Sequence, residues 1–123
     1  MRRAILDAGV VVGWFDRDGP HRPLRAEYES GALTVAGPRH LVADVLAIVA
    51  DRIPPDRLPS VGAELDRVRF QLQDPPLSVH AVWIAKGLPA DRAAYAALAA
   101  HLDVPLVTDD PELRRVAAAI PAG

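Results

Sequence analysis

The chain contains no cysteine, which removes disulfide bonds, thiolate metal ligands and cysteine nucleophiles together. It also lacks any run of the roughly 18 apolar residues that a transmembrane helix needs, and Asp7 interrupts the apolar stretch behind Met1, so neither a membrane segment nor a signal peptide is predicted. A strong excess of charge of one sign is missing too, because the formal net charge is −2. We therefore expect a cytoplasmic protein without a global basic field, in which any contact with nucleic acid comes from a local patch.

Glycine loops of the Walker or dinucleotide-binding type are absent, so a nucleotide-binding domain built on such a loop is not indicated. The chain has 123 residues, of which 50% are hydrophobic. This is enough for one buried core and too little for two ordinary domains. We expect a single domain over residues 1–123.

Acidic residues follow two apolar runs near the ends of the chain. Asp7 comes directly after Ala4-Ile5-Leu6, and Asp109 and Asp110 follow Leu106-Val107. Short apolar runs of this kind are typical of buried strands, and parallel sheets place ligand sites beyond the carboxyl ends of their strands. Carboxylates gathered at one edge repel one another unless a hard cation lies between them. The pattern therefore predicts a Mg²⁺ or Mn²⁺ site of the kind that serves phosphate chemistry.

Turn residues and prolines divide the rest of the chain into elements. The apolar run 10–15 fits a strand or a helix, of which we favour the helix, and 79–85 fits either. We expect a loop over 16–25 and a strand over 33–36. A helix over 39–52 should end before Pro54-Pro55, and the next helix should be capped by Ser60 and have an apolar face that reaches Leu72. Two more helices are expected over 93–102 and 112–119.

Three segments together resemble the PIN domains, in particular the bacterial toxin ribonucleases of VapC type. Residues 5–10 resemble the opening strand of that family, which carries its first acidic metal ligand at Asp7. Residues 40–47 resemble the helix that carries the second acid, at Asp44. Residues 87–110 resemble the C-terminal half, which ends in a Thr-x-Asp pattern at Asp110.

The resemblance implies a three-layer α/β/α domain with a central parallel sheet and the activity of a metal-dependent endoribonuclease. It implies Mg²⁺ or Mn²⁺ as the cofactor, with Asp7, Asp44 and Asp110 as the catalytic metal ligands and with Asp91 and Asp109 as weaker candidates. RNA is the implied substrate. A small antitoxin protein and a homodimer are the implied partners.

The chain departs from the family pattern at four positions, of which one is Asp44, where the family normally has glutamate. Gly9 stands where the family usually has Ser or Asn, and Ala47 stands where it has Asn. Arg92 takes the place of the third aspartate, and Asp91 lies one residue earlier, a rotation of about 100° on a helix. Because a guanidinium at this place could pair with Asp7 or Asp110, the alternative is a catalytically inactive PIN-like module that binds a partner or dimerises.

Plainer explanations exist for several of these residues. Asp44 alone fits an exposed charge on a helix, and Asp109 or Asp110 fits the cap of the helix that follows. Asp7 is harder to explain in this way, because an acid directly after a buried strand needs a partner. The four histidines, His21, His40, His80 and His101, show no spacing typical of metal ligands.

Overall fold

The computed structural model describes residues 2–15 and 19–117. Its centre is a four-stranded sheet in the order β3-β2-β1-β4, formed by β1 (Arg2–Leu6), β2 (Leu33–Gly37), β3 (Gln71–Leu72) and β4 (Leu106–Val107). All three strand pairs are parallel. The segments that leave β1 and β4 therefore emerge at the same edge of the sheet, with Asp7 at the end of β1.

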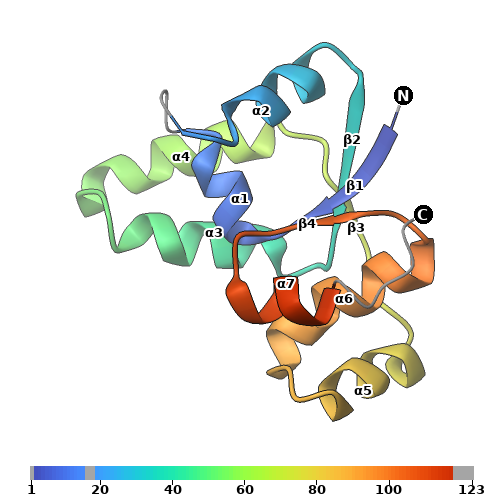
Figure 1. Ribbon diagram of the computed structural model, residues 1–123. Helices are drawn as coiled ribbons and strands as arrows, with labels where there is room; N and C mark the ends of the chain where they lie inside the picture. Colours follow the sequence, from blue (N-terminus) through green and yellow to red (C-terminus); the bar gives the residue numbers. More distant parts are fainter. Residues whose placement is uncertain (1, 16–18, 118–123) are drawn as a thin grey trace.

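Helices cover the sheet on both sides. Figure 1 shows α1 to α4 grouped on one side and α5, α6 and α7 on the other. Their bounds are α1 (Ala8–Gly13), α2 (Arg22–Glu29), α3 (Leu41–Ala50), α4 (Leu58–Asp66), α5 (Leu77–Ala85), α6 (Ala90–Leu102) and α7 (Pro111–Ala117), and a 3₁₀ turn spans Pro55–Arg57. This arrangement confirms the predicted α/β/α fold with a central parallel sheet. No helix in the described ranges is long and apolar enough to cross a membrane.

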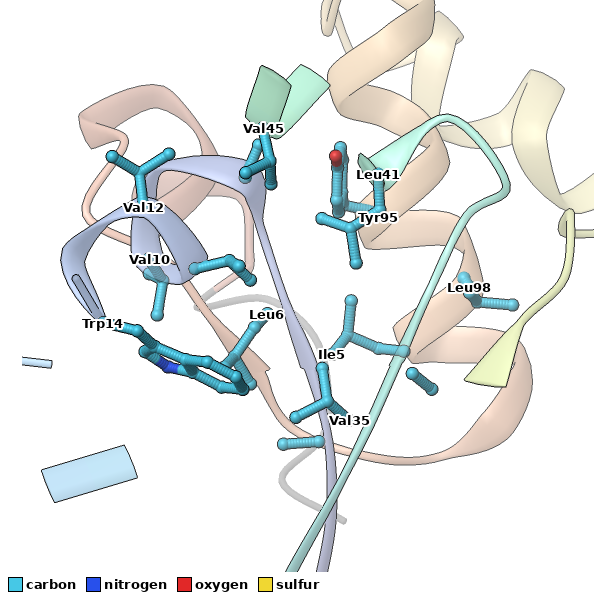
Figure 2. Close-up of a cluster of buried hydrophobic side chains, with 14 of the residues drawn as sticks. Ile5, Leu6, Val10, Val12, Trp14, Val35, Leu41, Val45, Tyr95 and Leu98 are labelled. Atoms are coloured by element: carbon cyan, nitrogen blue, oxygen red, sulfur yellow. The ribbon is translucent and has the colours of Figure 1, made fainter. Parts of the chain in front are cut away.

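The core forms around β1, where Ala4, Ile5 and Leu6 are completely buried. In Figure 2 the side chains of Ile5 and Leu6 lie among residues of α1, β2, α3 and α6. Both faces of a central parallel strand are covered, and this explains why the residues of β1 form a continuous apolar run. The rigid strand therefore holds Asp7 at a fixed place.

Helix α6 is buried along a continuous stretch, from Ala93 to Ala99. It packs against the sheet on one side and against α5 and α7 on the other. Alanine side chains permit this close approach on several sides at once. The start of α6, with Asp91 and Arg92, is thereby fixed beside the ends of the strands.

Three sequence predictions differ from the structure, and the open choice for 79–85 is settled. Ser60 does not cap a helix, because α4 begins at Leu58 with Pro59 in its first turn, where proline is favoured. The helix ends at Asp66, and Gln71–Leu72 forms the edge strand β3. Helix α2 begins inside the predicted loop, and 79–85 is helical. The last two residues of the predicted helix 112–119 lie outside the described residues.

A candidate metal-dependent site at the carboxyl edge of the sheet

A hollow of about 280 Å³ lies at the carboxyl edge of β1. Four acidic side chains line it, Asp7, Asp44, Asp91 and Asp110, which come from four separate segments of the chain. The other lining residues are Ala8, Gly9, Ala47, Ile48, Arg92, Tyr95 and Leu113. The structure thus brings together four of the five acids that the sequence singled out.

Asp7 caps α1 and is held at both carboxylate oxygens. Its Oδ1 accepts a hydrogen bond from the backbone N–H of Val10 at 3.0 Å, and its Oδ2 accepts one from the hydroxyl of Thr108. Burial raises the pKa of Asp7, and the nearby charges of Asp110 and Asp109 add to the rise, although the two hydrogen bonds oppose it. The surroundings therefore disfavour the ionised form of Asp7, and a cation in the hollow would stabilise that form.

Thr108 joins the two strand-end acids, a role that the sequence analysis missed. Its side chain is buried, with 6% exposed. The hydroxyl donates to Asp7 and accepts from the backbone N–H of Asp110 at 3.0 Å.

Asp110 caps the last described helix and keeps one oxygen toward the hollow. Its Oδ1 accepts from the backbone N–H groups of Glu112 and Leu113 at 2.9 and 3.0 Å. Of the two acids that the sequence offered as the cap, Asp110 is therefore the one that makes the capping bonds. Its Oδ2 lies 3.4 Å from Nε of Arg92.

Asp44 projects from the first turn of α3 and is bound by a tyrosine. The hydroxyl of Tyr95 donates to Oδ2 of Asp44 at 2.9 Å, and Nε2 of His40 lies 3.5 Å from the same oxygen. Burial raises the pKa of Tyr95, and the bond to Asp44 raises it further, so the phenol stays protonated and acts as a donor. Asp44 is thus a positioned acid with a partner, and neither Tyr95 nor His40 was identified from the sequence as part of the site.

Arg92 lies inside the hollow, at the place that the family resemblance gave it. Its Nη1 donates to Oε2 of Glu112 at 2.9 Å, and its Nε faces Asp110. The side chain is 43% exposed. Asp91 lines the same hollow from the first turn of α6, with its Oδ1 accepting the backbone N–H of Arg92 at 2.9 Å.

Asp109 lies apart from the other acids. Its side chain contacts Nε2 of His21, is 61% exposed, and does not line the hollow. As the structure stands, this residue ties the segment after β4 to the start of α2.

The acids of the hollow can be tested against the needs of a metal ion. Within residues 2–15 and 19–117, no group of three or more histidine or acidic side chains is placed to hold an ion by itself. The donors are nevertheless hard oxygens, and four carboxylates line the hollow together with one guanidinium. Mg²⁺ suits such a site, since it keeps several waters and is usually bound by one or two carboxylates plus phosphates of the substrate. The residues therefore fit a hydrated ion completed by substrate, and they do not fit a closed protein cage.

Comparison with known proteins identifies the family. Residues 4–119 match the PIN domain family, and the chain belongs to it. The fold is also similar to the crystal structure of PAE2754 from Pyrobaculum aerophilum, with a TM-score of 0.63, 20% sequence identity, and coverage of 99% of this chain and 97% of that chain. No curated protein matches this chain in sequence. PIN domains have a nuclease-like fold, generally depend on divalent metals and generally bind RNA.

Proposed function

We propose that this PIN domain is a metal-dependent endoribonuclease that hydrolyses phosphodiester bonds of RNA in the acid-lined hollow. The observation that carries the proposal is the convergence of four carboxylates from distant segments, among them Asp7, whose pKa is raised by partial burial. Mutual repulsion makes such an arrangement unfavourable without a cation. Family membership supports RNA as the substrate, because PIN domains generally bind RNA.

Asp7, Asp44 and Asp110 are the residues that would hold Mg²⁺ or Mn²⁺, directly or through water, with Asp91 and the more distant Asp109 as weaker candidates. The bound ion would supply an activated water molecule and a counter-charge for the phosphate. In the hydrolysis the water oxygen forms a new bond to phosphorus, the bond from phosphorus to the leaving ribose oxygen breaks, and that oxygen takes up a proton.

The surrounding residues would act by fixing these carboxylates before RNA arrives. Thr108 ties Asp7 to the backbone of Asp110, and Tyr95 holds Asp44 through a neutral donor. Gly9 adds no side chain beside Asp7, and a Cβ there would make only an ordinary contact, 3.7 Å from Oδ1 of Asp7. Pre-positioned oxygens avoid reorganisation during the reaction.

A cleavage assay on single-stranded RNA tests the proposal. The purified protein should cut the RNA with Mg²⁺ or Mn²⁺ and should stop when EDTA is added. Asp7→Asn and Asp110→Asn should each abolish the cutting, because each removes a ligand charge. Asp66→Asn, at an exposed position of α4, is the matched control and should cut normally. Equal cutting by all four proteins would reject the hollow as the site.

A second candidate function is a catalytically inactive PIN module that binds a partner or dimerises. The pairing of Arg92 with Asp110 and Glu112 favours it, since a guanidinium can neutralise the acids that would otherwise attract metal. In that case the wild-type protein would bind no Mn²⁺ and would cut no RNA under any metal condition.

The resemblance to VapC-type toxins supports a further assignment, a toxin that a small antitoxin neutralises. Expression of the chain alone should then slow cell growth, and Asp7→Asn should remove this effect. A short reading frame directly upstream should encode a protein that restores growth when it is expressed together with the chain. Growth arrest by Asp7→Asn equal to that by the wild type would argue against a toxic nuclease.

A homodimer is supported by α5, which has an apolar surface. Leu77, Val82 and Ile84 are 84%, 53% and 42% exposed, and residues 77–85 carry no acidic residue, lysine or arginine. An uncharged apolar surface meets its own copy without repulsion between like charges, and a two-fold interface brings the same patch of both subunits together. Leu77→Glu should shift the mass in sedimentation from dimer to monomer, whereas Leu72→Glu on β3 should not. A monomeric wild-type protein would reject the dimer.

A further inference from the structure

Arg92 is the feature of the hollow that the family pattern leaves unexplained. By the family resemblance it stands where an acid is expected, and it lines the hollow together with Asp7, Asp44 and Asp110. Its guanidinium is held at one end, where Nη1 donates to Glu112 at 2.9 Å and Nε faces Oδ2 of Asp110 at 3.4 Å. The residue is thus a cation fixed among carboxylates.

Glu112 explains how this cation is held in place. It lies in the first turn of α7, where an acid is favoured by the helix dipole, and its backbone N–H is bound to the capping oxygen of Asp110. Arg92, Asp110 and Glu112 therefore form a connected group that links the starts of α6 and α7. Because the side chain of Arg92 is 43% exposed, the guanidinium remains accessible from solvent.

Charge decides what such a group does in a nuclease site. A two-metal site uses a pair of ions to stabilise the attacking and the leaving oxygens at a phosphate. Arg is the side chain that can take over such a task, because its planar fork stays charged and matches phosphate oxygens. By the family resemblance an arginine stands here where the family has an acid, which leaves one ligand fewer for a second ion and supplies a positive charge instead. Asp91 lines the same hollow from the preceding position.

We propose that Arg92 replaces the second metal ion, so that this protein works with one divalent ion and one fixed guanidinium. The inference rests on the proposed ribonuclease function. When RNA binds, the guanidinium would contact phosphate oxygens. Asp7, Asp44 and Asp110 would hold the single ion directly or through water, with Oδ2 of Asp110 shared between the ion and Arg92. Glu112 is the positioning residue that keeps Arg92 in the hollow.

Calorimetric titration with Mn²⁺ counts the ions directly, without relying on activity. The wild type should bind one ion, and Arg92→Asp should bind two, because it adds a carboxylate and removes the guanidinium. Arg92→Gln should bind one ion at least about tenfold more tightly than the wild type, since a nearby like charge has been removed. Arg92→Lys should stay at one ion with an affinity close to that of the wild type. Arg57→Asp, an exposed position outside the hollow, makes the same charge change and should leave the wild-type result unaltered.

RNA cleavage by the same variants provides the second measurement. Arg92→Gln should lower kcat by about 10²–10³-fold at saturating Mn²⁺, the usual effect of removing a group that stabilises charge at the reacting centre. Arg92→Asp should recover most of the loss, because a second ion returns. Loss in both variants, or in neither, would overturn the inference.

The outcomes separate this inference from the proposed function. Two ions in the wild type, or one ion bound equally well by the wild type and Arg92→Asp, would overturn the role of Arg92 and leave the ribonuclease proposal standing. No ion in the wild type would overturn both, and binding by Arg92→Asp alone would then identify the wild type as the inactive module. Circular dichroism of each variant, with the wild-type spectrum expected, shows that a change in binding does not come from unfolding.

Discussion

Thr108→Val removes the link between Asp7 and Asp110 while nearly preserving the volume of the side chain. The variant loses a bond to a charged acceptor, which contributes about 1.5–3 kcal/mol, and leaves the backbone N–H of Asp110 without its acceptor, which adds about 1 kcal/mol. We expect a loss of about 3 kcal/mol in the free energy of unfolding. For a domain of this size the midpoint of thermal unfolding should fall by roughly 10 °C.

Urea unfolding followed by tryptophan fluorescence measures this loss, because Trp14 and Trp83 are both buried. The bond from Thr108 lowers the pKa of Asp7, so the pKa rises further in Thr108→Val. The stability lost in Thr108→Val is therefore largest above the folded-state pKa of Asp7, and the loss shrinks as the pH falls through that pKa. Thr108→Ser keeps the hydroxyl and should lose about 1 kcal/mol or less. A loss below about 0.5 kcal/mol in Thr108→Val, or an equal loss in the serine variant, would refute the proposed link.

Three other predictions follow from the contacts of the hollow. Asp7→Asn should stabilise the protein against urea at neutral pH but not at pH 3. Burial raises the pKa of Asp7, so the charged carboxylate destabilises the folded state fully only above the folded-state pKa. Unchanged stability at neutral pH would contradict this. Asp110→Ala should lower the free energy of unfolding by about 1 kcal/mol, because α7 loses its cap. Asp110→Asn should retain most of that stability, and equal stability of the two variants would argue against the cap. Tyr95→Phe should leave the circular dichroism spectrum unchanged and reduce RNA cleavage, because Asp44 loses its hydrogen-bond donor. Full activity of this variant would show that Asp44 needs no positioning by Tyr95.

The sequence predicted the strands around Asp7 and before Asp110 well, because buried apolar runs and the residues that end them are local signals. It also placed Arg92 in the hollow by comparison with the family pattern. The short edge strand β3 was missed, since two exposed residues that pair with β2 carry no periodicity.

The partners of the acids could not be predicted, because they depend on contacts between segments far apart in the chain. Thr108 reaches Asp7 across 101 positions, and Tyr95 reaches Asp44 across 51. The sequence also left open which acid caps α7 and which carboxylate Arg92 approaches. Only the packing of α6 against the sheet decides that Arg92 meets Asp110 and Glu112.

The most direct test of the account is the anomalous scattering of Mn²⁺ in crystals of the wild-type protein with an uncleavable single-stranded RNA. We expect one peak in the hollow, bounded by Asp7, Asp44 and Asp110, with a phosphate of the RNA among the ligands. A hollow that stays free of Mn²⁺ at saturating concentration, or a peak that lies elsewhere on the protein, would contradict the claim that these carboxylates form a metal-dependent site.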